Sequence, residues 1–174
     1  MELCVLLLLC GSRFLLRRDS RCCVLVDKAV GVKGKNTSLF YDTRLAMNLP
    51  LHLQTIWQQL GIVPEILQHK ALCVFDEASE LVDVETAFDG RVWQLTPQAA
   101  KAWRSMQAAA LADGIELKIA SAYRASSRQV ELIQNKLQAG IAIADILQVL
   151  APPGCSEHHT GRAIDLTSPG CAAL

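Results

Sequence analysis

The sequence lacks an excess of charge of either sign. Its Lys+Arg 17 balance its Asp+Glu 17, which gives a formal net charge of +0. Proteins that bind nucleic acid usually carry a surplus of positive charge on one face, so the composition predicts no nucleic-acid partner. At 174 residues the chain is long enough for one domain with an apolar core of its own.

The sequence also lacks the cysteine spacing of a zinc ribbon. Its Cys 7 is an odd number and none stand in a Cys-x-x-Cys arrangement, so neither a zinc ribbon nor a complete disulfide framework is indicated. Cys155 and Cys171 could pair in an oxidising compartment. Free thiols are the simpler expectation.

No apolar run is long enough to cross a bilayer. The run from Cys4 to Cys10 is short, and arginines follow it, whereas a secretory signal carries positive charge before its apolar core. We therefore predict no transmembrane segment, and the sequence shows no convincing export signal. Because residues 1–46 show no pattern that would bury one face, we expect them to be a poorly ordered or non-native extension. Residues 47–174 are expected to form the domain, and Met47 is a candidate natural start.

Periodic patterns begin after Met47. Asn48 is expected to cap a helix that ends at Gly61, and Pro64 to open a second, short helix. Ala71 to Phe75 and Arg91 to Leu95 are typical of strands, with an acidic loop between them. The loop lacks the fixed spacing of a calcium site, so a solvated face is expected.

The second half of the chain has clearer boundaries. Thr96 precedes a proline and is expected to cap a helix that ends at Asp113. Residues 115–121 alternate between apolar and polar, as in a half-buried strand. Two helical patterns follow, around residues 130–137 and 143–150.

A motif with the chemistry of a metal site lies near the carboxyl end. Glycine at position 161 allows a sharp reversal between His158 and a short strand that carries Asp165. An imidazole and a carboxylate are both ligands that zinc accepts readily. The alternative for such a pair is a surface hydrogen bond. His159 is expected to line a pocket or to be solvated.

A second motif follows the expected strand at residues 115–121. It comprises Ser121, Tyr123 and Arg124, with Gln129 shortly after. Just beyond a strand end, a planar guanidinium is well placed to bind a carboxylate or a developing oxyanion. Gln129 has an equally weighted alternative, because Ser126-x-x-Gln129 is also the pattern of a helix capping box.

Together the two motifs resemble the Ser-x-His-x-x-Gly-x-Ala-x-Asp and Ser-x-Tyr-Arg…Gln signatures of the zinc D-Ala-D-Ala carboxypeptidases of the VanY type. That family belongs to the LAS metallopeptidase group and is related to D-Ala-D-Ala dipeptidases and the hedgehog amino-terminal domain. The resemblance implies an α+β fold with a small, mostly antiparallel sheet flanked by helices. It implies zinc (Zn2+) on His158 and Asp165, and a catalytic Arg124 that also anchors the substrate. Three further residues are expected to bind substrate: Ser121, Gln129 and Ser156.

The function implied by the resemblance is zinc-dependent removal of the terminal D-alanine from peptidoglycan stem peptides. The expected partner is a peptide that ends in D-Ala-D-Ala, and the expected state is a monomer. The resemblance implies the cell envelope or periplasm, but without a convincing signal peptide a cytoplasmic location stays open. Three alternatives stay open: a related L,D-peptidase, a D-Ala-D-Ala dipeptidase, and a non-catalytic module that binds zinc or peptide.

One part of the family pattern is missing. Family members supply the third zinc ligand and the general base from a later Glu-x-x-Trp-x-His-like segment, but no histidine or glutamate follows Asp165 up to Leu174. We therefore expect the domain to be truncated at its carboxyl end and the 174-residue chain to be an inactive fragment.

Overall fold

The computed structural model describes residues 23–25, 49–67 and 72–168. These residues form two compact units. The first, here called the sheet unit, holds all the strands: its described residues are 23–25, 78–123 and 160–168. The second, here called the helical unit, comprises residues 49–67, 72–77 and 124–159.

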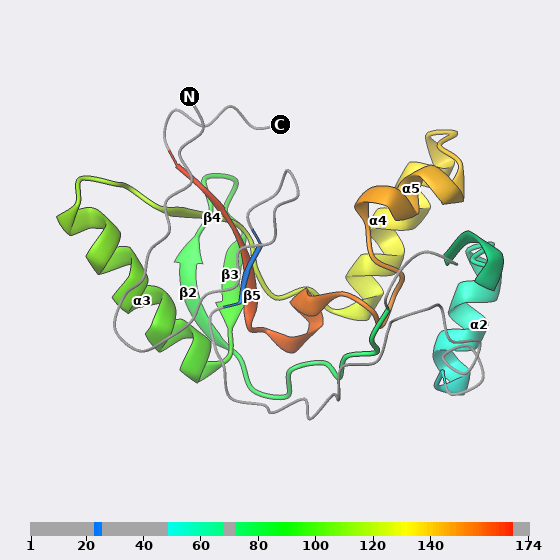
Figure 1. The fold of residues 1–174 in the computed structure, drawn as a ribbon, viewed down its shortest axis with the longest axis horizontal. Coiled ribbons are helices and arrows are strands. Elements are labelled where there is room, and N and C mark those ends of the chain that lie inside the picture. The colour runs from blue at the N-terminus through cyan, green and yellow to red at the C-terminus, as the bar shows by residue number, and fades with distance from the viewer. Residues whose placement is uncertain (1–22, 26–48, 68–71, 169–174) are drawn as a thin grey trace, which may run out of the picture. The chain divides into compact units, whose positions relative to one another are not determined.

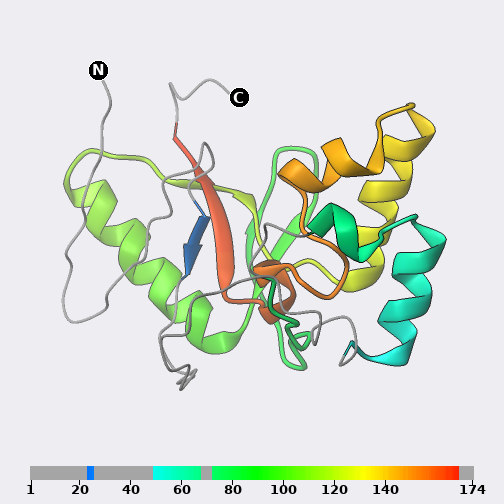
Figure 2. The ribbon, with the colours of Figure 1, turned by 45° about the vertical axis from the view of Figure 1, so that its right-hand side comes forward.

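The sheet unit contains two small antiparallel sheets and one long helix (Figure 1). One sheet has the strand order β1-β5-β4, with β5 in the centre, and the other is the hairpin of β2 and β3. Figure 2 shows β5 in red running beside the short blue strand β1. The elements are β1 (Cys23–Leu25), β2 (Val82–Thr86), β3 (Val92–Leu95), α3 (Pro97–Ala112), β4 (Lys118–Ser121) and β5 (Ala163–Thr167).

Helix α3 begins and ends where the sequence predicts. Thr96 is its N-cap, with the side-chain oxygen accepting a hydrogen bond from the N–H of Ala99 at 3.4 Å. Asp113 is the C-cap, and Gly114 follows with a φ of +77°. The helix packs against β2 and β3, and Trp103 in its middle is almost fully buried. The core of the sheet unit is entirely apolar and comprises Trp93, Leu95, Ala99, Ala100, Trp103, Met106, Ile119, Ala122 and Ile164.

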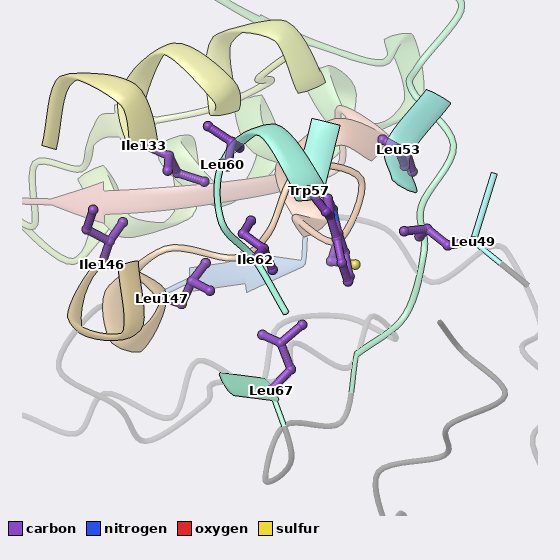
Figure 3. Packing of buried hydrophobic residues seen from close by; sticks show 10 residues of the cluster. Leu49, Leu53, Trp57, Leu60, Ile62, Leu67, Ile133, Ile146 and Leu147 are labelled. Carbon is purple, nitrogen blue, oxygen red and sulfur yellow. The ribbon is translucent and has the colours of Figure 1, made fainter. Parts of the chain in front are cut away.

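The helical unit is built from short helices around a second apolar core. Figure 3 shows the side chains of this core, most of which come from the first two helices and from α4 and α5, while Leu49, Leu60 and Ile62 come from residues that flank the first helix. Trp57 also makes a hydrogen bond within this core: its indole N–H donates to the carbonyl oxygen of Pro153 at 2.9 Å. The elements are α2 (Leu51–Gln59), the 3-10 helix η1 (Pro64–Leu67), α4 (Ser126–Gln138), α5 (Ile143–Val149) and the 3-10 helix η2 (Glu157–Thr160).

The fold is therefore α+β with antiparallel strand pairs, as predicted. Among the described residues no helix is both long and apolar enough to cross a membrane. Asn48, the expected cap of the first helix, lies outside the described residues. Strand β1 falls inside the segment 1–46 that the sequence marks as an extension, and it pairs with β5 at Cys23↔Asp165.

One strand was predicted in the wrong place. Residues 72–75 are not a strand, and the N–H of Phe75 donates instead to the carbonyl oxygen of Gly154 at 2.8 Å. The partner of β3 is instead β2, inside the segment expected to be an acidic loop. Val82 and Val84 alternate with acidic residues and pack against the apolar core, so the alternation is that of a half-buried strand. The many acidic residues of this segment made its alternation of apolar and polar residues hard to recognise in the sequence.

Candidate functional site

Within the sheet unit, the fold brings two predicted site residues together. Ser121 at the end of β4 is the cross-strand partner of Asp165 on β5, directly after a register shift that follows Ile119. Cross-strand partners lie side by side on a sheet. Asp165 is half-buried at this position.

Gly161, the glycine of the first motif, is required by its surroundings. Its φ is +63°, and a Cβ at this position would lie 3.0 to 3.3 Å from side-chain atoms of Leu81, Ala78 and Thr96. Its carbonyl oxygen accepts a hydrogen bond from the N–H of Thr96 at 2.9 Å. A larger residue would be strained both by the backbone and by contact. The sharp reversal before β5 thus depends on glycine, as the sequence predicts.

Within the helical unit, Arg124 is held by a buried amide. Its Nη1 donates a hydrogen bond to Oε1 of Gln129 at 2.9 Å, and Nε2 of Gln129 donates to the carbonyl oxygen of Ala151 at 2.6 Å. The Gln129 side chain is fully buried. Because both ends of the amide are bonded, its oxygen is fixed toward the guanidinium.

The capping-box alternative for Gln129 is wrong. The N-cap of α4 is Ala125, which makes no side-chain cap, and Ser126 is already the first helical residue. The N–H of Ser126 donates instead to Oε1 of Glu77 at 2.8 Å. A carboxylate at a helix amino terminus is favourable for both hydrogen bonding and the helix dipole. Glu77 therefore accepts the hydrogen bond at the amino terminus of α4. The side-chain oxygen of Gln129 accepts from Arg124 and takes no part in capping the helix.

The two motifs meet in the helical unit through their backbones. The N–H of Arg124 donates to the carbonyl oxygen of His158 at 3.1 Å, and the N–H of His159 donates to that of Ser156 at 3.0 Å. Ser156 and His158 are both buried, with His158 8% exposed. The fold thus gathers four predicted site residues here: Arg124, Gln129, Ser156 and His158.

His159 is not solvated, contrary to one of the two expectations for it. Its side chain is 0% exposed. Nε2 accepts a hydrogen bond from the N–H of Gly154 at 3.1 Å, and Nδ1 lies 2.5 Å from the carbonyl oxygen of Arg124. Burial, which disfavours the charged ring, lowers the pKa of His159 below its usual value. The ring is a neutral, fully bonded part of the interior.

The buried cysteine of the helical unit, Cys155, supplies no nucleophile. Cys73 and Cys155 are free thiols, and Cys171 lies outside the described residues. Burial, with a smaller effect of Cys73, raises the pKa of Cys155 to about 12. Because the thiolate is the reactive form, this thiol is inert near neutral pH.

The candidate metal ligands belong to different units. His158 lies in the helical unit and Asp165 in the sheet unit. An imidazole and a carboxylate are suitable donors for zinc. Among the described residues, however, no group of three or more His, Cys, Asp or Glu side chains forms a candidate metal site. The chemistry of these two donors fits zinc, and the described part of the chain does not supply a third.

Three contributors were missed at the sequence level: Glu77, the carbonyl oxygen of Ala151, and the N–H of Gly154. A backbone group has no signature in a sequence, so two of the three could not have been found there. Glu77 stood among several acidic residues with no spacing to single it out.

Comparisons with known proteins point to one family. The family model described as "VanY: D-alanyl-D-alanine carboxypeptidase" matches residues 93–174. The putative carboxypeptidase YodJ of Bacillus subtilis (strain 168) is 33% identical over 120 residues, which is 67% of this chain and 44% of that protein. The chain therefore spans less than half the length of this curated relative.

Three solved structures that are similar to this chain are also peptidases of this kind by name. The vancomycin-resistance D,D-pentapeptidase VanY, solved as a variant with Zn(II), is 26% identical with a TM-score of 0.41, covering 55% of this chain and 55% of that one. The LdcB LD-carboxypeptidase is 35% identical with a TM-score of 0.48, covering 54% of this chain and 45% of that one. VanYB in complex with D-alanine-D-alanine is 26% identical with a TM-score of 0.42, covering 57% and 56%.

The matched segment, residues 93–174, contains both motifs, from Ser121 to Asp165. The family model and the curated relative agree with each other and with the signatures that these motifs carry. Residues 93–174 of the chain belong to the VanY family of D-alanyl-D-alanine carboxypeptidases.

Proposed function

We propose that this chain is part of a zinc-dependent carboxypeptidase that removes the terminal D-alanine from peptidoglycan stem peptides. One observation carries the proposal: the guanidinium of Arg124 is held by a buried amide, while the backbone of Arg124 is bonded to His158 and His159 in the first motif. A guanidinium that is fixed in place is well suited to bind a peptide's terminal carboxylate, and the backbone of Arg124 is bonded to the candidate zinc ligand His158.

Arg124 would bind the carboxylate of the substrate. Its planar fork donates two parallel hydrogen bonds to such a group, and the bond to Gln129 reduces the ordering that binding requires. Gln129 is fully buried, so it would support binding of the peptide by holding the guanidinium of Arg124. Ser156 and Ser121 would add hydroxyl hydrogen bonds to the terminal residue.

His158 and Asp165 would hold the zinc ion. When bound, zinc polarises a scissile carbonyl and lowers the pKa of a bound water. Overall, one water is consumed, the amide C–N bond before the terminal residue breaks, and the amine nitrogen leaves with a proton. Arg124 can also stabilise the negative charge that develops on the carbonyl oxygen during this step. The third ligand and the base of the family signature are not found between Asp165 and Leu174.

Peptide recognition can be tested on the chain itself. We expect a peptide that ends in D-Ala-D-Ala with a free carboxylate to bind more tightly than the same peptide with a carboxyl-terminal amide, measured by calorimetry with zinc present. A peptide that ends in a single D-alanine after an L-residue separates the L,D-peptidase alternative. Equal affinity for the acid and the amide would contradict the proposed role of Arg124.

Metal binding needs a separate experiment. Two protein ligands bind zinc much more weakly than three, and no glutamate follows the motif to accept the proton of the water. We therefore expect the 174-residue chain to lose zinc on dialysis against a mild chelator and to release no D-alanine. Stoichiometric zinc after dialysis, together with D-alanine release, would show that residues outside the two motifs complete the site.

A further inference from the structure

His159 stands at a position that the family signature leaves open, yet its ring is more completely buried than that of His158. It connects two segments that are far apart in the sequence. One is the Pro152–Pro153–Gly154 turn and the other is the segment that begins at Arg124. Because both ring nitrogens are bonded to backbone atoms, the buried ring restrains the two segments that it joins.

The hydrogen bonds determine the protonation of the ring. The N–H of Gly154 can only donate, so Nε2 of His159 must be the acceptor. The hydrogen therefore resides on Nδ1, which donates to the carbonyl oxygen of Arg124 at 2.5 Å. One neutral ring thus bridges the backbone of Gly154 to the backbone of Arg124.

The Gly154 end of the bridge is anchored in the core of the helical unit. Gly154 has a φ of +85°, and a Cβ there would clash with the side chain of Leu53. Its carbonyl oxygen accepts from the N–H of Phe75 at 2.8 Å, and the neighbouring carbonyl of Pro153 accepts from the indole of Trp57 at 2.9 Å. These bonds hold the turn against the apolar core, so the Nε2 bond of His159 starts from a rigid point.

The Arg124 end of the bridge carries the functional group. The backbone of Arg124 is bonded at both its N–H, to His158, and its carbonyl, to His159. The side chain is bonded to Gln129. With the backbone and the guanidinium both fixed, little freedom remains to be lost when a carboxylate binds.

We propose that His159 is a positioning residue that transfers the fixed position of the Gly154 turn to Arg124. It does not contact the substrate and acts only by orienting the guanidinium. This inference rests on the proposed function, because it assumes that Arg124 binds a peptide carboxylate. It adds a requirement that the signature does not contain, namely a side chain at position 159 that both donates to Arg124 and accepts from Gly154.

The test replaces the ring by groups that keep only one of its two bonds. In His159→Asn the amide nitrogen can stand in for Nδ1, and in His159→Gln the amide oxygen can stand in for Nε2. Either replacement opens the bridge. We expect the affinity for the D-Ala-D-Ala acid to fall roughly three- to ten-fold, the effect of losing one pre-ordered side chain. The affinity for the carboxyl-terminal amide should not change. His52→Asn, on the exposed face of α2, is the matched control.

A double-mutant cycle with Arg124→Lys separates positioning from general stability. If His159 acts through Arg124, the His159 replacement should have no further effect on acid binding once Arg124 is lysine. Amide hydrogen exchange at Arg124 should also be faster in both His159 variants, because its backbone is less restrained. Additive effects, or folded variants with wild-type acid binding, would overturn the inference. So would a failure of both replacements to fold, because His159 would then serve the fold alone. A wild-type chain that does not distinguish acid from amide would overturn the proposed function first, and this inference with it.

Discussion

The sheet unit and the helical unit bury different kinds of side chain. All four buried polar or charged side chains among the described residues lie in the helical unit: Gln129, Ser156, His158 and His159. The core of the sheet unit is apolar, and its hairpin contains the two buried polar atoms without a hydrogen-bond partner among the described residues, Glu85 Oε2 and Trp93 Nε1.

This difference affects how closely each unit fixes the positions of its side chains. An apolar core tolerates exchange of one side chain for another of similar volume. A buried polar side chain requires each of its partners, because an unbonded polar atom in the interior is costly. The helical unit therefore specifies the position of Arg124 closely, whereas Ser121 and Asp165 of the sheet unit are positioned by strand pairing.

The largest expected effect is on the apolar core of the sheet unit. Trp103 on α3 is 1% exposed, and Trp103→Ala should lower the free energy of unfolding by about 3–5 kcal/mol, because it leaves a large cavity. Urea denaturation measures the change. Leu111→Ala on the same helix is the control, because Leu111 is 66% exposed and its replacement should cost less than about 0.5 kcal/mol. Similar losses for the two variants would show that the core does not dominate the stability of this unit.

The next effect is on recognition by the helical unit. Arg124→Lys keeps the positive charge but cannot make the planar, two-bonded contact with a carboxylate. We expect acid-peptide binding to weaken by about 2–3 kcal/mol, at the low end for a charged pair since the charge remains. The free energy of unfolding should change less, because the lysine ammonium can still donate to Oε1 of Gln129. Calorimetry and urea denaturation on the same preparations separate the two quantities. Arg128→Lys is the control, because Arg128 is exposed and pairs with Glu131 on the surface of α4.

A smaller effect is expected at the turn that anchors His159. Gly154→Ala should lower the free energy of unfolding by about 1–3 kcal/mol, because its positive φ suits glycine and the added Cβ would displace Leu53. Gly140→Ala is a matched control with a similar φ of +82° and open space around the site. If the two substitutions lower the free energy of unfolding equally, the contact with Leu53 contributes nothing and the loss comes from backbone strain alone.

The smallest effect concerns residues 1–46. We propose that a chain beginning at Met47 folds with a Tm within about 4 °C of that of the full chain, the shift that roughly 1 kcal/mol produces at this size. The deletion removes β1, a three-residue edge strand, but leaves the pairing of β4 with β5. Differential scanning calorimetry measures the change. A much larger drop would mean that β1 is an essential part of the sheet unit.

Local patterns in the sequence were enough for most elements. The limits of α3 follow from Thr96 and Gly114, and the strand character of residues 115–121 follows from their alternation. These signals depend on neighbouring residues only, because caps and periodicity act within a turn or two of chain. The hairpin strand β2 was missed for the same reason. Its acidic residues looked like a loop until pairing with β3 gave them an outer face.

The sequence by itself also determined the chemistry on offer: an arginine after a strand, and a histidine and an aspartate around a glycine that must reverse the chain. Only the tertiary structure decided how these residues are held. In the structure Gln129 is bonded to Arg124 and does not cap the helix, and the ring of His159 lies between Arg124 and Gly154. Such bonds join residues that are up to 35 positions apart, and many of their acceptors are backbone carbonyls. A backbone carbonyl is the same in every residue, so no sequence pattern can show which one a buried side chain will bind.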